Sequence, residues 1–174
     1  IDIGAHIGLS VLYFKSIYPN SKILAFEPNP NTFDILKENI YINNLENIEI
    51  HNIAIWKDCG TKDFYIDSND TGWDSNASLI KGGWTGKEDT KRITIKTEML
   101  SKFISRKVDL LKIDAEGSEI PILKSNKGLL KDIENIVIEY HPIKGYKVQD
   151  LLQLLSKQFS LKITSDGKLL KKPI

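Results

Sequence analysis

The feature that most constrains the fold is an apolar run that passes directly into a polar turn and then a helix. Val108 to Leu111 has the pattern of a buried strand, Lys112-Ile113-Asp114-Ala115-Glu116-Gly117 follows, and Ser118 to Lys124 has a helical pattern. A strand that leads straight into a helix is typical of parallel α/β sheets, which bind ligands at the carboxyl ends of their strands. If the backbone stays extended, Asp114 and Glu116 point to the same side. We therefore predict a pair of carboxylates at the ligand-binding edge, the alternative being a solvated turn.

The first eight residues predict the end of a strand, a tight glycine turn and the start of a helix. Gly4 and Gly8 allow a sharp turn and a close approach of a ligand to the backbone. The spacing Asp-x-Gly-x-x-x-Gly differs from the Gly-x-Gly-x-x-Gly of dinucleotide enzymes. An acid at position 2 repels a pyrophosphate but suits a ligand with an ammonium and a sulfonium group. We assign a cofactor-binding role to the turn residues Asp2, Gly4, Ala5, His6 and Gly8.

A second predicted strand, Lys22 to Phe26, ends in Glu27-Pro28-Asn29-Pro30. Glu27 lies about 20 residues beyond the glycine turn, which is the offset of an acid that holds ribose hydroxyls. Asn29 is predicted to cap the next helix, with Pro30 as its first residue. Together, the turn and Glu27 indicate a nucleoside-type ligand, with Pro28 beside it. A third predicted strand, Ile48 to Ile55, places Asn52 and Ala54 at the adenine edge.

The predicted strand from Asn135 to Tyr140 ends just before His141. In a parallel sheet we expect this strand to lie beside the one that ends at Asp114, which would bring His141 close to the two carboxylates. Lys112 and Glu139 are predicted to form a buried ion pair across the two strands. A single histidine is more often structural, but its place at the end of a strand makes His141 a candidate for the site.

The remaining chain completes an α/β pattern around one polar segment. Asp67 to Arg92 is rich in Gly, Ser, Asn, Asp and Thr, and we interpret it as a functional insertion loop. Its two tryptophans, Trp73 and Trp84, fit a carbohydrate acceptor, because sugars present apolar C–H faces and a rim of hydroxyls. The alternative is that they only pin the loop to the core. The other predicted elements are strands over Thr61–Ile66 and Ile93–Lys96, helices over Thr97–Ile104 and Val148–Phe159, and a hairpin over Leu161–Leu170.

Composition narrows the possible partners and the cellular setting. The 174 residues suit a single domain, 1–174, and the net charge of +1 provides no field that would attract nucleic acid or an anionic membrane. No apolar run approaches the roughly 18 residues of a membrane span. Cys59 is the only cysteine, which fits a reducing compartment, so we expect a cytoplasmic protein. Because Ile1 lies inside a predicted strand, we expect N-terminal elements to be lacking, and the oligomeric state stays open.

Four motifs resemble the FkbM family of S-adenosylmethionine-dependent methyltransferases. They are Asp-Ile-Gly-Ala-His-Ile-Gly, Ala-Phe-Glu-Pro-Asn-Pro, Leu-Leu-Lys-Ile-Asp-Ala-Glu-Gly-Ser-Glu and Ile-Glu-Tyr-His, in that order along the chain. His6 departs from the family pattern, which more often has Asn. The resemblance implies the class I methyltransferase fold. This is a Rossmann-like, seven-stranded, mostly parallel sheet flanked by helices, with an antiparallel C-terminal hairpin.

The resemblance also implies an O-methyltransferase that uses S-adenosyl-L-methionine and acts on a hydroxyl of a sugar, glycan or similar small molecule. The base candidates, in order, are Glu116, Asp114 and His141, and Asp114 is also expected over the methionine end of the cofactor. We expect no metal, although these three residues are also suitable ligands for a divalent cation. Two alternatives stay open. A nicotinamide-dependent oxidoreductase is disfavoured by the glycine pattern, and a non-catalytic binding module by the intact acidic block.

Overall fold

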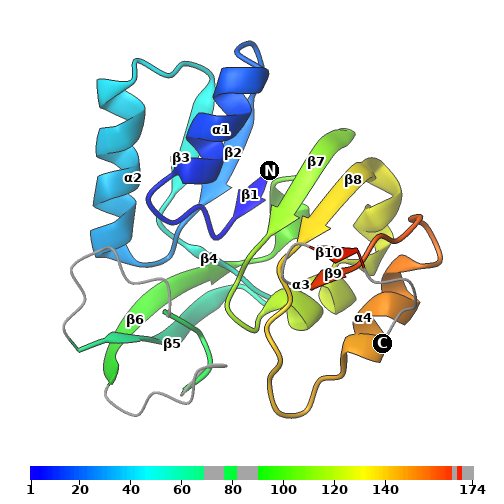
Figure 1. The fold of residues 1–174 in the computed structure, drawn as a ribbon. Coiled ribbons are helices and arrows are strands. Elements are labelled where there is room, and N and C mark those ends of the chain that lie inside the picture. Colours follow the sequence, from blue (N-terminus) through cyan, green and yellow to red (C-terminus); the bar gives the residue numbers. More distant parts are fainter. Residues whose placement is uncertain (69–76, 82–89, 166–167, 170–174) are drawn as a thin grey trace.

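A five-stranded parallel sheet forms the centre of the protein (Figure 1). The computed structural model describes residues 1–68, 77–81, 90–165 and 168–169. The strand order is β3-β2-β1-β7-β8, and all neighbours run parallel. The strands are β1 (Asp2–Ile3), β2 (Ile23–Phe26), β3 (Ile48–His51), β7 (Val108–Ile113) and β8 (Ile133–Ile138). The chain moves outward in one direction from β1 and in the other from β7, so the strand order reverses between these two strands, which is where open α/β sheets bind ligands.

Helices connect the strands and cover the sheet on both faces. They are α1 (Leu9–Ile17), α2 (Pro30–Ile42), α3 (Glu119–Ser125) and α4 (Val148–Leu155), with 3₁₀ turns η1 (Leu100–Lys102) and η2 (Lys127–Asp132). Side chains alternate along β2. Ile23 and Ala25 pack in one apolar cluster with Val11 of α1 and Leu36 of α2, while Phe26 belongs to the cluster that contains α3 and α4. The two faces of the sheet are therefore buried by different helices, as βαβ units require.

The predicted start of α2 is confirmed. The Asn29 side chain accepts a hydrogen bond from the backbone N–H of Asn31 at 3.1 Å, and Pro30 is the first helical residue. Within the described residues, none of the helices combines the length and the apolarity needed to cross a membrane.

A second sheet lies beside the carboxyl edge of the central sheet (Figure 1). It contains β4 (Ala54–Ile55), β5 (Gly60–Asp67) and β6 (Thr90–Glu98), with β5 and β6 antiparallel and β4 parallel to β6. The single strand predicted over Ile48–Ile55 is therefore wrong. The chain leaves the central sheet after β3, because the apolar Ala54 packs in the second sheet with Phe64 and Ile95.

Other boundaries also differ from the predictions. The helix predicted over Thr97–Ile104 is reduced to η1, because Thr97 and Glu98 still belong to β6, where they pair with β4. The insertion predicted over Asp67–Arg92 is shorter, since Asp67 belongs to β5 and Thr90 to Arg92 belong to β6. Trp73 and Trp84 lie outside the described residues.

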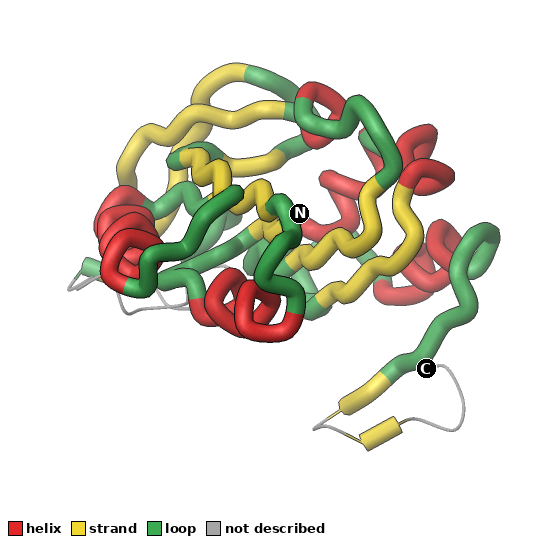
Figure 2. The backbone as a smooth tube through the Cα atoms, turned by 90° about the horizontal axis from the view of Figure 1, so that it is seen from above, coloured by secondary structure: helices red, strands yellow, loops and turns green. Residues whose placement is uncertain are grey.

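The C-terminal hairpin is confirmed, but it does not extend the central sheet in the described part of the chain. β9 (Thr164–Ser165) and β10 (Lys168–Leu169) pair antiparallel as a separate two-stranded sheet. Figure 2 shows this hairpin standing apart from the central strands. The expected seven-stranded sheet is not confirmed. Both residues of β9 are exposed, so this short strand has no apolar face with which to dock.

We expect Gly4→Ala to lower the free energy of unfolding by about 2–4 kcal/mol. Gly4 has a φ of +78°, and an added Cβ would lie 1.7 Å from the carbonyl oxygen of Asp114. The control is Gly128→Ala, where a Cβ would meet nothing within 4 Å, so the change should stay within about 0.5 kcal/mol. Urea denaturation measures both variants. Equal stabilities would show that the two turns are not packed as described.

Candidate active site

The glycine turn and the acidic turn meet where β1 and β7 lie side by side. Asp2 in β1 is 1% exposed, and its Oδ1 is 3.1 Å from Nζ of Lys112 in β7. Lys112 also donates to the carbonyl oxygen of Gly4 at 3.0 Å and lies 3.5 Å from Oδ2 of Asp114. The hydroxyl of Ser10 donates to the other oxygen of Asp2. One ammonium group thus connects the first strand, the glycine turn and the acidic turn.

The predicted ion pair between Lys112 and Glu139 is wrong. In the register of β7 and β8, Lys112 is opposite Val137, and its ammonium turns toward β1 instead. The side chain of Glu139 is 70% exposed and lies 3.8 Å from Nε2 of His141. The buried Asp2 accounts for the difference, because a carboxylate without water requires a charged partner.

Glu27 is held at the end of β2 by the glycine turn. It is 6% exposed, and its carboxylate accepts hydrogen bonds from the backbone N–H of His6 at 2.9 Å and of Asn29 at 2.8 Å. Burial raises the pKa of the Glu27 carboxyl to about 7, against the lowering effect of these two hydrogen bonds. The amide of Asn52 donates to the carbonyl oxygens of Glu27 at 2.9 Å and Pro28 at 3.1 Å. Asn52 therefore acts on the backbone that carries Glu27.

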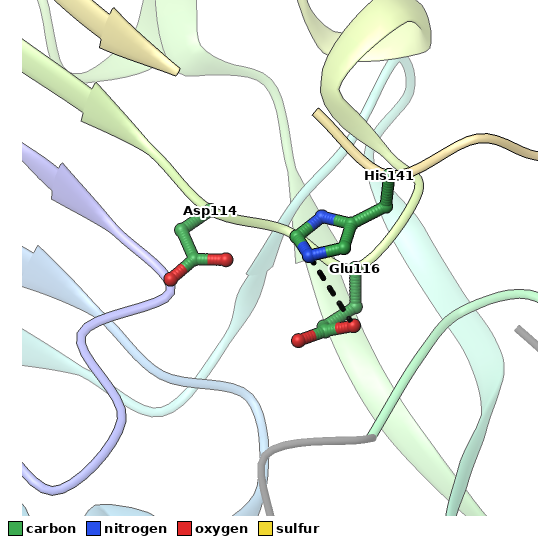
Figure 3. Close-up of side chains that lie close together, drawn as sticks. All are labelled: Asp114, Glu116 and His141. Atoms are coloured by element: carbon green, nitrogen blue, oxygen red, sulfur yellow. Dashed lines mark ion pairs between the residues drawn. The ribbon is translucent and has the colours of Figure 1, made fainter. Parts of the chain in front are cut away.

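Asp114 and Glu116 of the acidic turn lie close to His141, which follows β8, as predicted (Figure 3). One potential ligand atom from each residue lies within 4.8 Å of the other two. The geometric reason is different from the one we expected. β7 ends at Ile113, and Glu116 has a φ of +48°, so a turn rather than an extended backbone places the two carboxylates side by side.

His141 is buried against this turn and contacts a residue that the sequence analysis did not assign to the site. It is 5% exposed, its Nδ1 is 3.0 Å from Oε1 of Glu119, and its Nε2 is 3.8 Å from Oε2 of Glu116. Burial by itself would lower the pKa of His141. The hydrogen bond with Glu119 and the charges of Glu116 and Glu119 outweigh burial, so the net effect is a pKa raised above the ordinary value of histidine.

A pocket of about 150 Å³ connects the two turns. Its lining includes seven residues predicted for the site, namely Gly4, His6, Glu27, Pro28, Ala54, Asp114 and Glu116. The other predicted residues are not part of the lining: Asp2 and Ala5 are buried, Gly8 directly precedes α1, Asn52 binds the backbone at Glu27, and Nε2 of His141 lies 3.8 Å from Oε2 of Glu116. This volume is below the roughly 300–1,000 Å³ of typical ligand pockets, so a nucleoside-sized ligand would be partly exposed.

Part of the connection between β5 and β6 also borders the pocket. Ala77 and Leu79 contribute to the lining, and the hydroxyl of Ser78 donates to the backbone oxygen of Glu116 at 2.7 Å. Sequence reasoning missed these residues, because small side chains in a polar segment carry no distinguishing pattern. The bridge between Ser78 and Tyr65 is what brings this segment to the acidic turn.

Asp114, Glu116 and His141 also form a donor set that suits a divalent cation, since carboxylates and imidazole bind such ions. The Nδ1 contact with Glu119 directs Nε2 of His141 toward Glu116. In metal sites, a carboxylate on the second ring nitrogen commonly orients a histidine ligand in this way.

The parallel sheet, the glycine turn and the pocket at the strand reversal define an α/β protein of Rossmann type. More specifically, the chain belongs to the FkbM methyltransferase family, because the sequence model of the protein family described as "Methyltransferase FkbM domain" matches residues 2–161. It is a methyltransferase, and the family predicted from the sequence motifs is confirmed.

Curated relatives agree with this assignment. The chain is 28% identical over 184 residues to Methyltransferase 1 of Beauveria bassiana, covering 94% of this chain and 72% of the relative. It is 28% identical to the hexuronic acid methyltransferase AglP of Haloferax volcanii, covering 94% and 64%, respectively. It is 24% identical to the 2-O-methyltransferase NoeI of Sinorhizobium fredii, covering 86% and 65%.

A solved structure supports the fold. The chain resembles the crystal structure of Methyltransferase FkbM from Methylobacillus flagellatus with a TM-score of 0.58 at 18% identity. The similarity covers 90% of this chain and 35% of that chain, so this chain spans about a third of its length.

The raised pKa of Glu27 predicts a pH-dependent stability. Between about pH 4.5 and 7 the folded state binds more protons at Glu27 than the unfolded state, so this carboxyl makes stability fall as the pH rises through that window. Relative to Glu27→Gln, the wild type should lose up to about 3 kcal/mol of unfolding free energy between pH 5 and 8. Urea denaturation across that range tests this. Parallel profiles for the two proteins would contradict the burial of an ionisable Glu27.

Proposed function

We propose that the protein transfers a methyl group from S-adenosylmethionine to a hydroxyl of a sugar, glycan or similar polyhydroxylated small molecule. The observation that carries this proposal is the continuous pocket that runs from the glycine turn and Glu27 to the carboxylates Asp114 and Glu116. A methyl donor and an acceptor must meet within one site, and this pocket places the glycine turn with Glu27 at one end and the acidic turn with Asp114 and Glu116 at the other.

The cofactor would occupy the end formed by β1, β2 and β4. The carboxylate of Glu27 would accept the ribose hydroxyls, and its hydrogen bonds from His6 and Asn29 hold it in place before binding. Gly4 and His6 line the approach, while Pro28 and Ala54 would contact the adenine side. Asp2, Ala5 and Gly8 would shape the glycine turn from behind it, and Asn52 fixes the backbone at Glu27.

The acceptor would lie at the end formed by the acidic turn. When bound, the sulfonium cofactor supplies an electrophilic methyl group. The chain's own residues must align the acceptor oxygen and take its proton, and the second task is worth roughly 10²–10⁴-fold in rate. Glu116 is our first candidate for the base. Asp114 also lines the pocket but lies 3.5 Å from the ammonium of Lys112, which makes it a weaker proton acceptor, and His141 comes third.

The acceptor class rests on the relatives and on the segment around Ser78. Two relatives are named as a hexuronic acid methyltransferase and a 2-O-methyltransferase. Ala77 and Leu79 line the pocket, so the β5–β6 connection borders the proposed acceptor end.

The first test concerns the cofactor. We expect S-adenosylhomocysteine to bind, and Glu27→Ala to weaken binding by about 1.5–3 kcal/mol, the range for a hydrogen bond to a charged group. Calorimetry measures the affinity, with Glu49→Ala as the control, since that strand residue of β3 is outside the pocket lining. Binding of NAD in place of S-adenosylhomocysteine would support an oxidoreductase. Equal affinity for wild type and Glu27→Ala would remove Glu27 from the site.

The second test concerns turnover. With a hexuronic acid or another sugar acceptor, Glu116→Gln should lower the single-turnover rate by about 10²-fold or more and change cofactor affinity little. A near-normal rate would transfer the role of base to Asp114 or His141. Activity lost with a chelator and restored by a divalent cation would show that transfer requires a metal and would contradict the expectation of a metal-free site. Absence of methyl transfer in the wild type with any acceptor would favour a non-catalytic binding module.

A further inference from the structure

We propose that Glu119 is a positioning residue that holds His141 and the acidic turn in their active arrangement. This inference rests on the proposed function and adds a residue to the same site. Glu119 is the first residue of α3 and is 1% exposed. A carboxylate at the start of a helix is common on protein surfaces, where it interacts with the helix dipole. A carboxylate this deeply buried requires specific partners.

Those partners come from both strands that flank the site. Oε1 of Glu119 accepts hydrogen bonds from the backbone N–H of Ala115 at 3.2 Å and of Gly117 at 3.0 Å. The same oxygen is 3.0 Å from Nδ1 of His141, which follows β8. A single oxygen atom therefore connects the turn after β7 with the histidine after β8.

The contacts to the turn stabilise an unusual backbone. Glu116 has a φ of +48° and Gly117 a φ of +95°, and a left-handed conformation is unfavourable for a residue such as Glu. The N–H groups on either side of Glu116 both point at Glu119. This arrangement holds the side chain of Glu116 in the pocket beside Asp114.

The contact to His141 determines which ring nitrogen carries the hydrogen. An ionised carboxylate only accepts hydrogen bonds, so Nδ1 must be the donor, and in the neutral ring Nε2 then holds the lone pair. Nε2 faces Oε2 of Glu116 and Oε1 of Glu139, each at 3.8 Å. Glu119 therefore presents the proton-accepting atom of His141 toward the pocket side of the site.

The first experiment reads the tautomer directly and needs no methyl transfer. In ¹⁵N NMR, with the pH raised until the imidazole of His141 is neutral, the wild-type ring should carry its hydrogen on Nδ1. Loss of the signal in His141→Gln separates it from His6 and His51. In Glu119→Gln the population of this tautomer should fall. A wild-type ring protonated on Nε2 overturns the proposal, and this measurement stands even where the variant does not fold.

The second experiment separates positioning from stability. Glu119→Gln should lower kcat by about 10-fold or more, with KM for the acceptor and the affinity for S-adenosylhomocysteine nearly unchanged. The matched control is Glu98→Gln, because Glu98 is also a buried carboxylate but pairs with Lys102 at 2.8 Å and Lys96 at 3.2 Å outside the pocket lining. Its kcat should equal that of the wild type.

The outcomes of the two experiments distinguish a failure of this inference from a failure of the proposed function. A kcat for Glu119→Gln within about twofold of that for Glu98→Gln would show that Glu119 has only a structural role, and overturns the inference. If the wild type transfers no methyl group, the proposed function fails, and the tautomer of His141 alone decides whether Glu119 positions the ring.

Discussion

The ion pair between Asp2 and Lys112 is the interaction on which the rest of the site depends. A carboxylate that is 1% exposed is costly without a partner, and Nζ of Lys112 lies 3.1 Å away. Because the same ammonium donates to the carbonyl oxygen of Gly4 and approaches Asp114, the arrangement of both turns is coupled to one buried charge. Removing Lys112 would leave that charge uncompensated, which is more damaging than losing an exposed pair.

The topology of the sheet places this pair where it is needed. β1 and β7 are separated by about a hundred residues of sequence, yet they are paired neighbours, with Asp2 opposite Lys112. The strand order reverses between them, so the segments that follow the two strands diverge and leave room for a ligand. The glycine turn and the acidic turn therefore meet as a direct consequence of the fold, and the pocket joins Gly4 and Asp114.

Local patterns in the sequence were sufficient for features that depend on neighbouring residues. The cap at Asn29 and the strand that ends before Asp114 are examples, since turn and capping chemistry act over a few positions. Pairing across strands was not predictable in the same way. Lys112 pairs with Asp2 and not with Glu139, because β1 lies beside β7 and carries the buried carboxylate. Ala54 belongs to the second sheet and not to the central one. Glu119 was missed because an acid in the first turn of a helix ordinarily needs no further explanation.

The negative charge of the pocket restricts the kind of ligand that it can bind. The lining contains the carboxylates of Glu27, Asp114 and Glu116, and within the described part of the chain it includes neither a lysine nor an arginine. A dinucleotide would bring its pyrophosphate close to these carboxylates, and like charges a few ångströms apart repel in a partly desolvated site. A ligand with a sulfonium and an ammonium group would be attracted instead. Lys112 moderates the field at Asp114 without entering the lining, so the balance of the pocket stays acidic. The electrostatics thus favour a cationic methyl donor over a nicotinamide cofactor, independently of the glycine spacing.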